Sequence, residues 1–351
     1  MSPTLLALLE QSVALEASDL HLMAGMPPSV RIDGDIEFLP DDPLPTEDLW
    51  ALVNDRKREV LERTRDLNFS MTVPEVGRFR VALYFQRGQL EASLRIVPNR
   101  IRAFEELGLP PVVRDLVQRP AGLVLVTGPT GAGKTTALNA MVDWINSERR
   151  SRIVTIEDPI EYLHAHKRSV VIQRELDDDT YSFQGALMAA LRQDPNVICL
   201  GEMRSLETVA TALTAAETGH LVLGTLHTQG CCQTIERIVD VFPTSQHNQV
   251  RTQLASTLQG IVSLQLLPRM AERGRVLACE VMVGTMAVKN IIRTGKIEQL
   301  SSLIQTGGED GMVSMDRCLR RLYESGVISY ETALSRAHNQ NEFRALRAVA
   351  V

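Results

Sequence analysis

Apolar and polar residues in the first hundred positions follow the short repeats of a small mixed domain. Apolar side chains recur at helical spacing near the N-terminus, at Leu5, Leu8, Leu9 and Val13. Short strands, a charged helix and an alternating hairpin are expected after them, over residues 18–22, 30–34, 47–65 and 78–97. Gly34 and Arg87–Gly88 stand where turns are needed. The pattern predicts a small α/β domain over residues 1–100.

The pattern changes after a linker that we place at residues 101–115. Nearly continuous apolar runs now alternate with helical segments, and these runs cover residues 122–127, 153–156, 197–200 and 221–226. Such runs are typical of parallel strands that are buried on both faces. Helices are expected over residues 136–145 and 212–218. We therefore expect a doubly wound α/β domain over residues 116–351, with a mostly helical part from about residue 285.

Composition narrows the functional classes. The 351 residues are 44% apolar and carry a formal net charge of −6. This balance disfavours a nucleic-acid motor, which would share the same core fold but present a basic footprint. The five cysteines form no CxxC pair, so we expect a reducing cytoplasm and no metal knuckle. No apolar run approaches the roughly 18 residues that span a bilayer, and any membrane link is expected to run through partners.

A phosphate-binding motif directly follows the first apolar run. It matches G-x-x-x-x-G-K-[ST] at every fixed position, and its residues are Gly128, Pro129, Thr130, Gly131, Ala132, Gly133, Lys134 and Thr135, with Thr136 next in the expected helix. Backbone N–H groups of such a loop and the helix N-terminus bind phosphate oxygens. Lys134 is expected to reach the β- and γ-phosphates of ATP, and the Thr135 hydroxyl to bind Mg²⁺.

Two acidic loops follow other expected strands. Glu157 and Glu161 come after residues 153–156, and Glu202 comes after residues 197–200. A lone acidic loop is usually only a solvated loop. Ligands of open α/β sheets, however, bind outside the carboxyl ends of the strands. Two such loops downstream of a complete phosphate loop therefore favour a catalytic role for at least one of them.

Two histidines bracket the last of these strands. His220 precedes residues 221–226 and His227 follows them. A lone histidine is more often structural than functional. Because His227 stands at the carboxyl end of its strand, it could polarise or sense a terminal phosphate, while His220 is the weaker candidate.

Four segments together resemble the Walker A, Asp box, Walker B and His box of the secretion and type IV pilus ATPases. They are residues 128–135, 156–162, 191–204 and 216–228. Residues 18–22 and 27–34 resemble the N-terminal domain of that family, and residues 287–293 resemble a C-terminal motif of its pilus-retraction members. The similarity covers nearly the whole chain.

The resemblance implies an architecture and a set of roles. It implies a PAS-like N-terminal domain, a RecA-like ATPase domain and a homohexamer, with ATP between the two domains of one subunit. Glu202 would orient water. Glu157 and, less directly, Glu161 would act on metal or water. Thr135 and Glu157 would bind Mg²⁺. Further residues implied by the matched segments are Arg80 and Arg95, with Arg78 and Arg87 nearby, and in a secondary role His220 and Arg204. Without the resemblance these arginines would read as surface solubilisers.

The resemblance also implies a task. The chain has neither the four-cysteine motif nor the long N-terminal region of assembly ATPases, which favours the PilT/PilU retraction branch. Thr294 and Lys289 depart from that branch's C-terminal motif, and an accessory PilU-like role stays open. The implied partners are an inner-membrane platform protein and a paralogous pilus ATPase, with no direct nucleic-acid partner. The implied location is the cytoplasmic face of the inner membrane.

Overall fold

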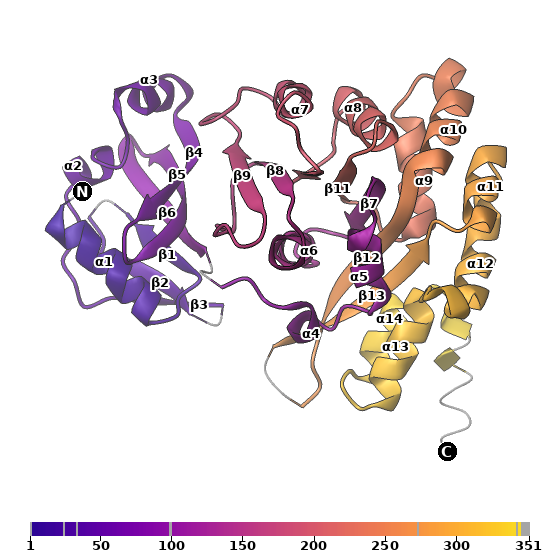
Figure 1. Cartoon of the computed structure of the whole chain (residues 1–351). Helices are drawn as coiled ribbons and strands as arrows, with labels where there is room; N and C mark the ends of the chain where they lie inside the picture. Colours follow the sequence, from indigo (N-terminus) through magenta and orange to yellow (C-terminus); the bar gives the residue numbers. More distant parts are fainter. Residues whose placement is uncertain are drawn as a thin grey trace. The chain divides into compact units, whose positions relative to one another are not determined.

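The computed structural model of the chain describes residues 2–23, 25–32, 34–97, 100–271, 274–341 and 343–344. These residues divide into two units (Figure 1). The first unit consists of Met1–Arg100 together with Pro159–Leu163, and the second of Ile101–Asp158 together with His164–Val351. The short segment 159–163 thus belongs with the first unit although its sequence neighbours belong with the second.

An antiparallel sheet forms the first unit, in the strand order β3-β2-β1-β6-β5-β4. Its strands are β1 (Asp19–Leu22), β2 (Ser29–Ile32), β3 (Asp35–Phe38), β4 (Asp66–Val73), β5 (Gly77–Gln86) and β6 (Gln89–Val97). Apolar side chains of alternate positions, such as Phe79, Val81 and Leu83, are fully buried in the unit's core with the N-terminal helix α1 (Pro3–Ala14). The expected strands, the turn at Gly34 and the hairpin turning at Arg87–Gly88 are confirmed.

One expected helix of the first unit is wrong in its extent. Residues 47–65 form two helices, α2 (Thr46–Trp50) and α3 (Asp55–Thr64), instead of one. The break falls at Asn54, whose side-chain oxygen accepts a hydrogen bond from the N–H of Lys57 at 2.9 Å. Asparagine competes with helical hydrogen bonds in this way and starts a new helix as its N-cap.

A seven-stranded sheet forms the centre of the second unit, in the order β13-β12-β7-β11-β10-β8-β9. Its strands are β7 (Gly122–Thr127), β8 (Arg152–Glu157), β9 (Val170–Glu175), β10 (Val197–Leu200), β11 (Leu221–Leu226), β12 (Leu258–Pro268) and β13 (Arg275–Val283). All neighbouring strands are parallel except β12 and β13. All four apolar runs are confirmed as strands, and β7, β10 and β11 are buried along their whole length.

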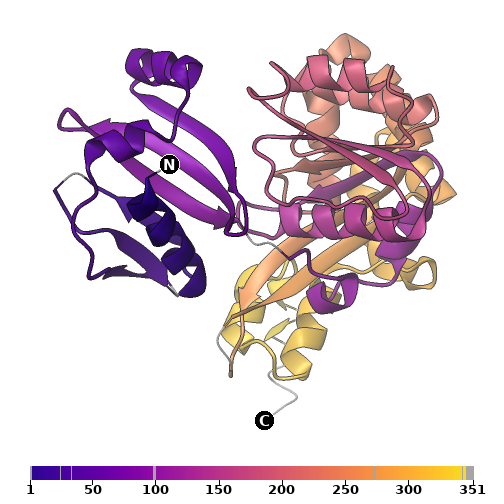
Figure 2. The same cartoon turned by 60° about the vertical axis from the view of Figure 1, so that its left-hand side comes forward.

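Helices cover both faces of this sheet (Figure 2). One face packs against α5 (Val112–Gln118), α6 (Lys134–Glu148) and α13 (Met315–Glu324). The other packs against α7 (Phe183–Ala190), α8 (Leu206–Glu217), α9 (Cys231–Asp240), α10 (His247–Thr257), α11 (Met286–Thr294) and α12 (Leu300–Thr306). The RecA-like arrangement of a parallel sheet between helical layers is therefore confirmed.

Some elements of the structure have no counterpart in the expected pattern. They are the strands β3, β4, β9, β12 and β13, the helices α7, α9 and α10, and, inside the linker at residues 101–115, helix α4 (Phe104–Leu107) and the start of α5. The helical C-terminal part is confirmed by α11, α12, α13 and α14 (Tyr330–Arg336).

The strand order places four loops side by side. Strands β7, β11, β10 and β8 are consecutive neighbours and run in parallel, so their carboxyl ends meet at one edge of the sheet. The motif at 128–135, His227, Glu202 and Glu157 all stand at this edge.

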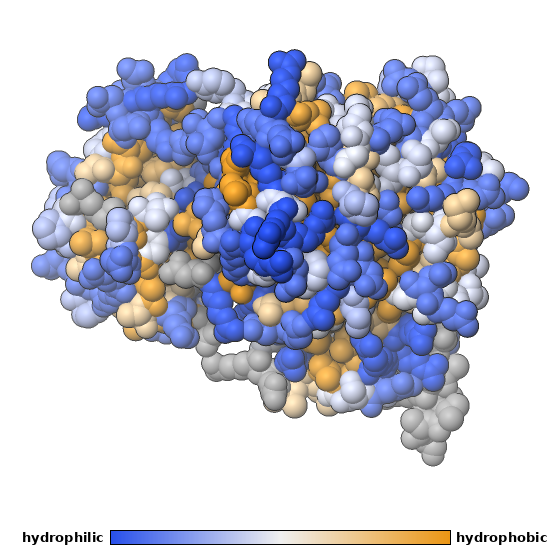
Figure 3. Space-filling view, viewed as in Figure 1, coloured by the Kyte–Doolittle hydropathy of each residue, from blue (hydrophilic) through white to orange (hydrophobic). Residues whose placement is uncertain are grey.

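Among the described residues, no helix is long and apolar enough to span a bilayer. The face drawn in Figure 3 is mostly hydrophilic.

Candidate active site

The loop between β7 and α6 is shaped to bind an anion. Gly133 starts α6 with a left-handed φ of 89°, and no side chain caps this helix N-terminus. Gly128 has a φ of 140°, and a Cβ atom there would overlap the carbonyl oxygen of Leu264 on the neighbouring β12. The sequence therefore needs glycine at these two points, and the helix N-terminus presents partial positive charge to the loop.

Lys134 lies over this loop. Its side chain is buried, and its Nζ donates hydrogen bonds to the carbonyl oxygens of Gly128 at 2.9 Å and Pro129 at 3.0 Å. The ammonium group is thus held at the mouth of the loop and not extended into solvent. The remaining expected ATP-binding residues, through Thr135 and Thr136, occupy the same loop and the first turn of α6.

A hydrogen-bonded chain links Lys134 to the candidate catalytic carboxylate. The Nζ of Lys134 lies 3.4 Å from Nδ1 of His227, and Nε2 of His227 lies 3.0 Å from Oε1 of Glu202. An ammonium group can only donate, so Nδ1 of His227 accepts and Nε2 carries the proton that it donates to Glu202. His227 therefore stands between the phosphate-binding lysine and the carboxylate, although these residues lie far apart in sequence.

Arg204 is the second partner of Glu202. Its guanidinium group pairs with the same carboxylate, and its own side chain is mostly exposed. Burial alone would raise the pKa of Glu202. The hydrogen bond from Arg204, the neighbouring His227 and the positive charge of Arg204 together outweigh burial and hold the pKa of this carboxyl below its usual range. Glu202 is thereby kept ionised, as a group that orients or accepts a proton from water must be.

Glu157 occupies the end of β8 and is buried. Its Oε1 accepts hydrogen bonds from the Thr155 hydroxyl at 2.6 Å and the Gln173 side-chain amide at 3.1 Å. Neither holding residue was expected from the sequence. Thr155 could have been found, because residues two apart on a strand share a face. Gln173 could not, because its strand β9 has too little apolar pattern to be recognised.

Two expected residues of the second unit differ in position. His220 stands at the amino end of β11, where its Nδ1 donates to the carbonyl oxygen of Ala215 at 3.0 Å, so it does not join His227 at the carboxyl edge. Thr135 does stand on the loop. Among the described residues, no group of three or more His, Cys, Asp or Glu side chains could cage a metal ion.

The expected arginines belong to the first unit. Arg80 on β5 and Arg95 on β6 are direct cross-strand partners, and Nε of Arg95 lies 3.0 Å from Oδ1 of Asp19. Glu161 falls in the segment 159–163 of the same unit. That segment is bound to the sheet by Arg78, whose Nε donates to the carbonyl oxygen of Ile160 at 3.0 Å. Arg78 therefore holds the segment that follows Glu157.

The site and the similarity to known proteins indicate the same class of protein. A complete phosphate loop at the carboxyl edge of a RecA-like sheet, with a lysine–histidine–glutamate chain beside it, defines a P-loop ATPase. The chain belongs to the family described as type II/IV secretion system protein, whose model matches residues 61–344.

Three relatives show where in the family the similarity is strong. The type IV pilus retraction ATPase PilT of Pseudomonas aeruginosa is 46% identical over 96% of this chain and 98% of its own length. The type IV pilus ATPase PilU of the same organism is 39% identical over 96% of this chain and 89% of its own length. A crystal structure of the pilus retraction motor PilT with bound ADP superimposes with a TM-score of 0.91 at 48% identity, covering 96% of this chain and 98% of that one.

Proposed function

We propose that this chain is an ATP-hydrolysing motor that powers the retraction of type IV pili. The observation that carries the proposal is the chain of contacts from Lys134 through His227 to Glu202, beside a complete phosphate loop. The similarity to a pilus retraction ATPase over nearly the full length of both chains supports the mechanical task. The proposed domains are residues 1–100, a linker at 101–115 and the ATPase domain at 116–351.

The site residues divide the work of hydrolysis. The loop N–H groups and the N-terminus of α6 bind the phosphates of ATP, and Lys134 exchanges its bonds to loop carbonyls for bonds to the β- and γ-phosphates. Glu202 orients the attacking water and receives its proton. His227 contacts both Lys134 and Glu202, so a shift of Lys134 toward the terminal phosphate would change the hydrogen bond that His227 donates to the carboxylate. Arg204 keeps Glu202 ionised until water is in place.

The donors at this edge suit Mg²⁺. The Thr135 hydroxyl would hold the ion directly, and the buried Glu157 carboxylate would act on it from the end of β8. When bound, Mg²⁺ neutralises negative charge on the terminal phosphate oxygens. Thr155 and Gln173 keep the Glu157 carboxylate in one orientation.

Arg80 and Arg95 are proposed to stabilise charge on the transferring phosphoryl group. Two like charges directly opposite each other on neighbouring strands destabilise a sheet. Asp19 already pairs with Arg95 and offsets part of this repulsion, and an anionic ligand would offset more of it. Guanidinium groups also match phosphate geometry. Glu161 and His220 stay secondary candidates in this scheme.

The proposed working assembly is a homohexamer at the cytoplasmic face of the inner membrane. It would act on the pilus platform protein and cooperate with a paralogous pilus ATPase, without binding nucleic acid. The higher identity to the retraction ATPase than to PilU favours the main retraction role over an accessory one.

The two residues that depart from the C-terminal motif of the retraction branch, Lys289 and Thr294, both lie on α11. There Nζ of Lys289 donates to the carbonyl oxygen of Ser256 at 3.4 Å.

Two variants test the catalytic part. Lys134→Ala should lose nucleotide binding and turnover together, whereas Glu202→Gln should bind ATP and release no phosphate above background. Phosphate release with Mg²⁺ and binding of a fluorescent ATP analogue separate these outcomes, with Glu324→Gln on α13 as a surface control. Normal turnover in both site variants would refute the site.

A deletion strain tests the mechanical part. Loss of a retraction motor should leave surplus surface pili and abolish surface motility, both of which microscopy and a motility assay measure. Complementation with the Glu202→Gln variant should not restore motility. Cells without pili would instead indicate an assembly motor.

A further inference from the structure

Two cysteine side chains meet where α13 packs on β13. Cys279 lies in β13 and Cys318 in the first turns of α13, and their exposed fractions are only 1% and 2%. The backbone N–H of Cys279 donates to Sγ of Cys318 at 3.4 Å. Both are free thiols in the structure. The Cys318 sulfur therefore already lies against the backbone of Cys279, and both side chains belong to one apolar core.

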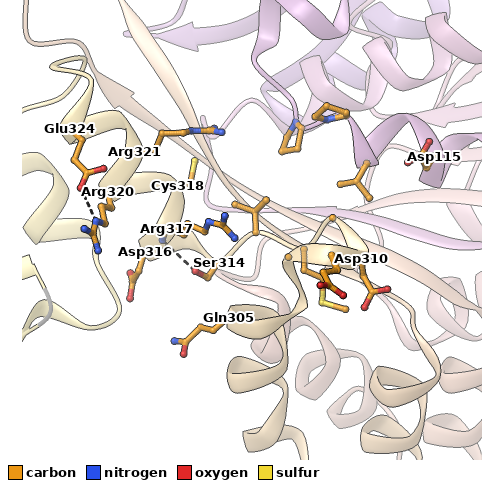
Figure 4. A pocket seen from close by; sticks show the side chains of 18 of the residues that line it. Asp115, Gln305, Asp310, Ser314, Asp316, Arg317, Cys318, Arg320, Arg321 and Glu324 are labelled. Atoms are coloured by element: carbon orange, nitrogen blue, oxygen red, sulfur yellow. Dashed lines mark hydrogen bonds and ion pairs between the residues drawn. The ribbon is translucent and has the colours of Figure 1, made fainter.

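A hollow of about 1120 Å³ reaches this pair (Figure 4). Cys318 forms part of its wall, together with Arg317 and Arg321 of the same helix. The close-up shows the Cys318 sulfur among these arginine side chains. A small polar oxidant can therefore approach Cys318 from this hollow, although the thiol is buried by area.

The two thiols differ in acidity. The hydrogen bond from the Cys279 thiol, helped by the Cys279 backbone N–H and by Arg321, outweighs burial and lowers the pKa of Cys318 to about 6. The same thiol hydrogen bond, together with burial, raises the pKa of Cys279 well above its ordinary value. These opposite directions make Cys318 the better candidate for the thiolate and Cys279 for the protonated partner. This division is typical of a nucleophilic cysteine with a resolving cysteine.

We propose that Cys318 and Cys279 form a peroxide-sensitive dithiol that closes into a disulfide between α13 and β13. The Cys318 thiolate attacks one oxygen of hydrogen peroxide, the O–O bond breaks, and hydroxide leaves and is protonated to water. The Cys318 sulfenic acid formed in this way is then attacked by the Cys279 sulfur. The S–O bond breaks, a second water leaves, and both sulfur atoms are oxidised by one electron each as peroxide is reduced.

The disulfide would change how the C-terminal helices are attached. It would close a loop from residue 279 to residue 318 that contains α11 and α12, and would join α13 covalently to the last strand of the ATPase sheet. Reduction by a dithiol would reopen it. The pair is independent of the proposed nucleotide chemistry, because neither cysteine stands at the carboxyl edge that holds Lys134 and Glu202.

Peptide mapping of the full chain tests the proposal without any variant. The folded protein is treated at neutral pH with a few equivalents of hydrogen peroxide, quenched, denatured and alkylated with N-ethylmaleimide. We expect a peptide that links Cys279 to Cys318, which disappears after reduction, while Cys199 and Cys231 are alkylated. Alkylated Cys318 after this treatment, or a linkage of Cys279 to another cysteine, would overturn the proposal.

Two variants separate nucleophile from resolving thiol. In Cys279→Ser, the sulfenic acid on Cys318 has no partner and should be trapped by dimedone. In Cys318→Ser, Cys279 should stay unmodified at the same peroxide dose. Cys199→Ser is the matched control, since that thiol is equally buried and its pKa is raised by burial. Dimedone labelling of Cys279 in Cys318→Ser would contradict the assignment of roles.

Discussion

At the scale of single residues, the surroundings of Glu202 determine whether the proposed catalytic carboxylate is ionised. Its carboxylate is half enclosed and contacts two different donors, Arg204 from its own loop and His227 from the neighbouring strand end. Burial opposes its ionisation and the two donors favour it. A residue poised between these opposing effects responds strongly to the loss of either donor.

Arg204→Ala should move the acid limb of the ATPase pH profile to higher pH. The folded protein holds the pKa of Glu202 below its ordinary value, so Glu202 stays ionised until the pH falls under that range. Without Arg204 the desolvation that raises this pKa is less opposed, and protonation begins at higher pH. Turnover measured across the acid range tests this.

The matched control for this prediction is Arg336→Ala, which removes an exposed arginine from the last turn of α14. It should leave the profile unchanged. A limb that does not move in Arg204→Ala would show that the exposed arginine contributes nothing to the ionisation of Glu202.

His227→Ala should lower turnover by about 10²-fold while ATP binding is largely kept, since it removes one positioned proton-carrying group but leaves the loop and Lys134 in place. Steady-state phosphate release and equilibrium binding of a nucleotide analogue measure the two effects separately. His247→Ala, at the start of α10, is the control because that histidine has no part in the proposed scheme. Equal losses in both variants would argue against a specific part for His227.

At the scale of elements, the phosphate loop depends on the strand beside it. Gly128 has a backbone conformation that favours glycine, and a Cβ atom there would also overlap the Leu264 carbonyl oxygen on β12. A Cβ atom at Gly131 would meet nothing within 4 Å. The two glycines of one motif are thus required for different reasons. Gly128 allows the loop to lie against β12, whereas Gly131 is needed only for its left-handed φ of 78°.

Gly128→Ala should therefore destabilise the protein by more than about 2 kcal/mol, in the range of substitutions that strain a buried backbone. Gly131→Ala should cost about 1–2 kcal/mol, the usual penalty for a left-handed non-glycine residue. Urea unfolding monitored by circular dichroism measures both, provided that the transitions are two-state. A smaller loss in Gly128→Ala than in Gly131→Ala would contradict the packing argument.

The elements that could be predicted are those with strong local pattern. The strands at 122–127, 197–200 and 221–226 were expected with the bounds that the structure shows, because strands buried on both faces are continuously apolar. Strand β9 was not, since it lies at the edge of the sheet and mixes apolar with polar residues. The break between α2 and α3 depended on one asparagine cap that competed with a helical charge pattern.

The candidate site shows a similar division. The phosphate loop, Glu202 and His227 could be named from the sequence because each follows an apolar strand at the same sheet edge. The tautomer of His227 and the ionisation of Glu202 could not, since both follow from distances between residues far apart in the chain. The pairing of Cys279 with Cys318 likewise carries no sequence signal, because no fixed spacing joins a strand cysteine to a helix cysteine.

At the scale of the whole molecule, the proposed motor must combine two units, of which only the second contains the phosphate loop. If Arg80 and Arg95 of the first unit stabilise transition-state charge, Arg95→Ala should lower turnover by about 10²–10³-fold with ATP binding retained. Phosphate release by a preparation whose hexameric mass is checked by light scattering tests this. Arg87→Ala, at the distant turn of the same hairpin, is the control, and equal effects of the two variants would count against the proposed role.

The strand order of the ATPase sheet also has a consequence for biosynthesis. Strand β7 pairs with β11 on one side and with β12 on the other, and both partners lie far downstream of it in the chain. A nascent polypeptide therefore emerges from the ribosome with a nearly continuous apolar segment, residues 122–127, and cannot shield either edge of it until residues 221–226 have been translated. Such a segment is a target for aggregation during synthesis. The demand for chaperones during synthesis should therefore be greatest before residue 226 has emerged, because only after that point can β7 pair with β11.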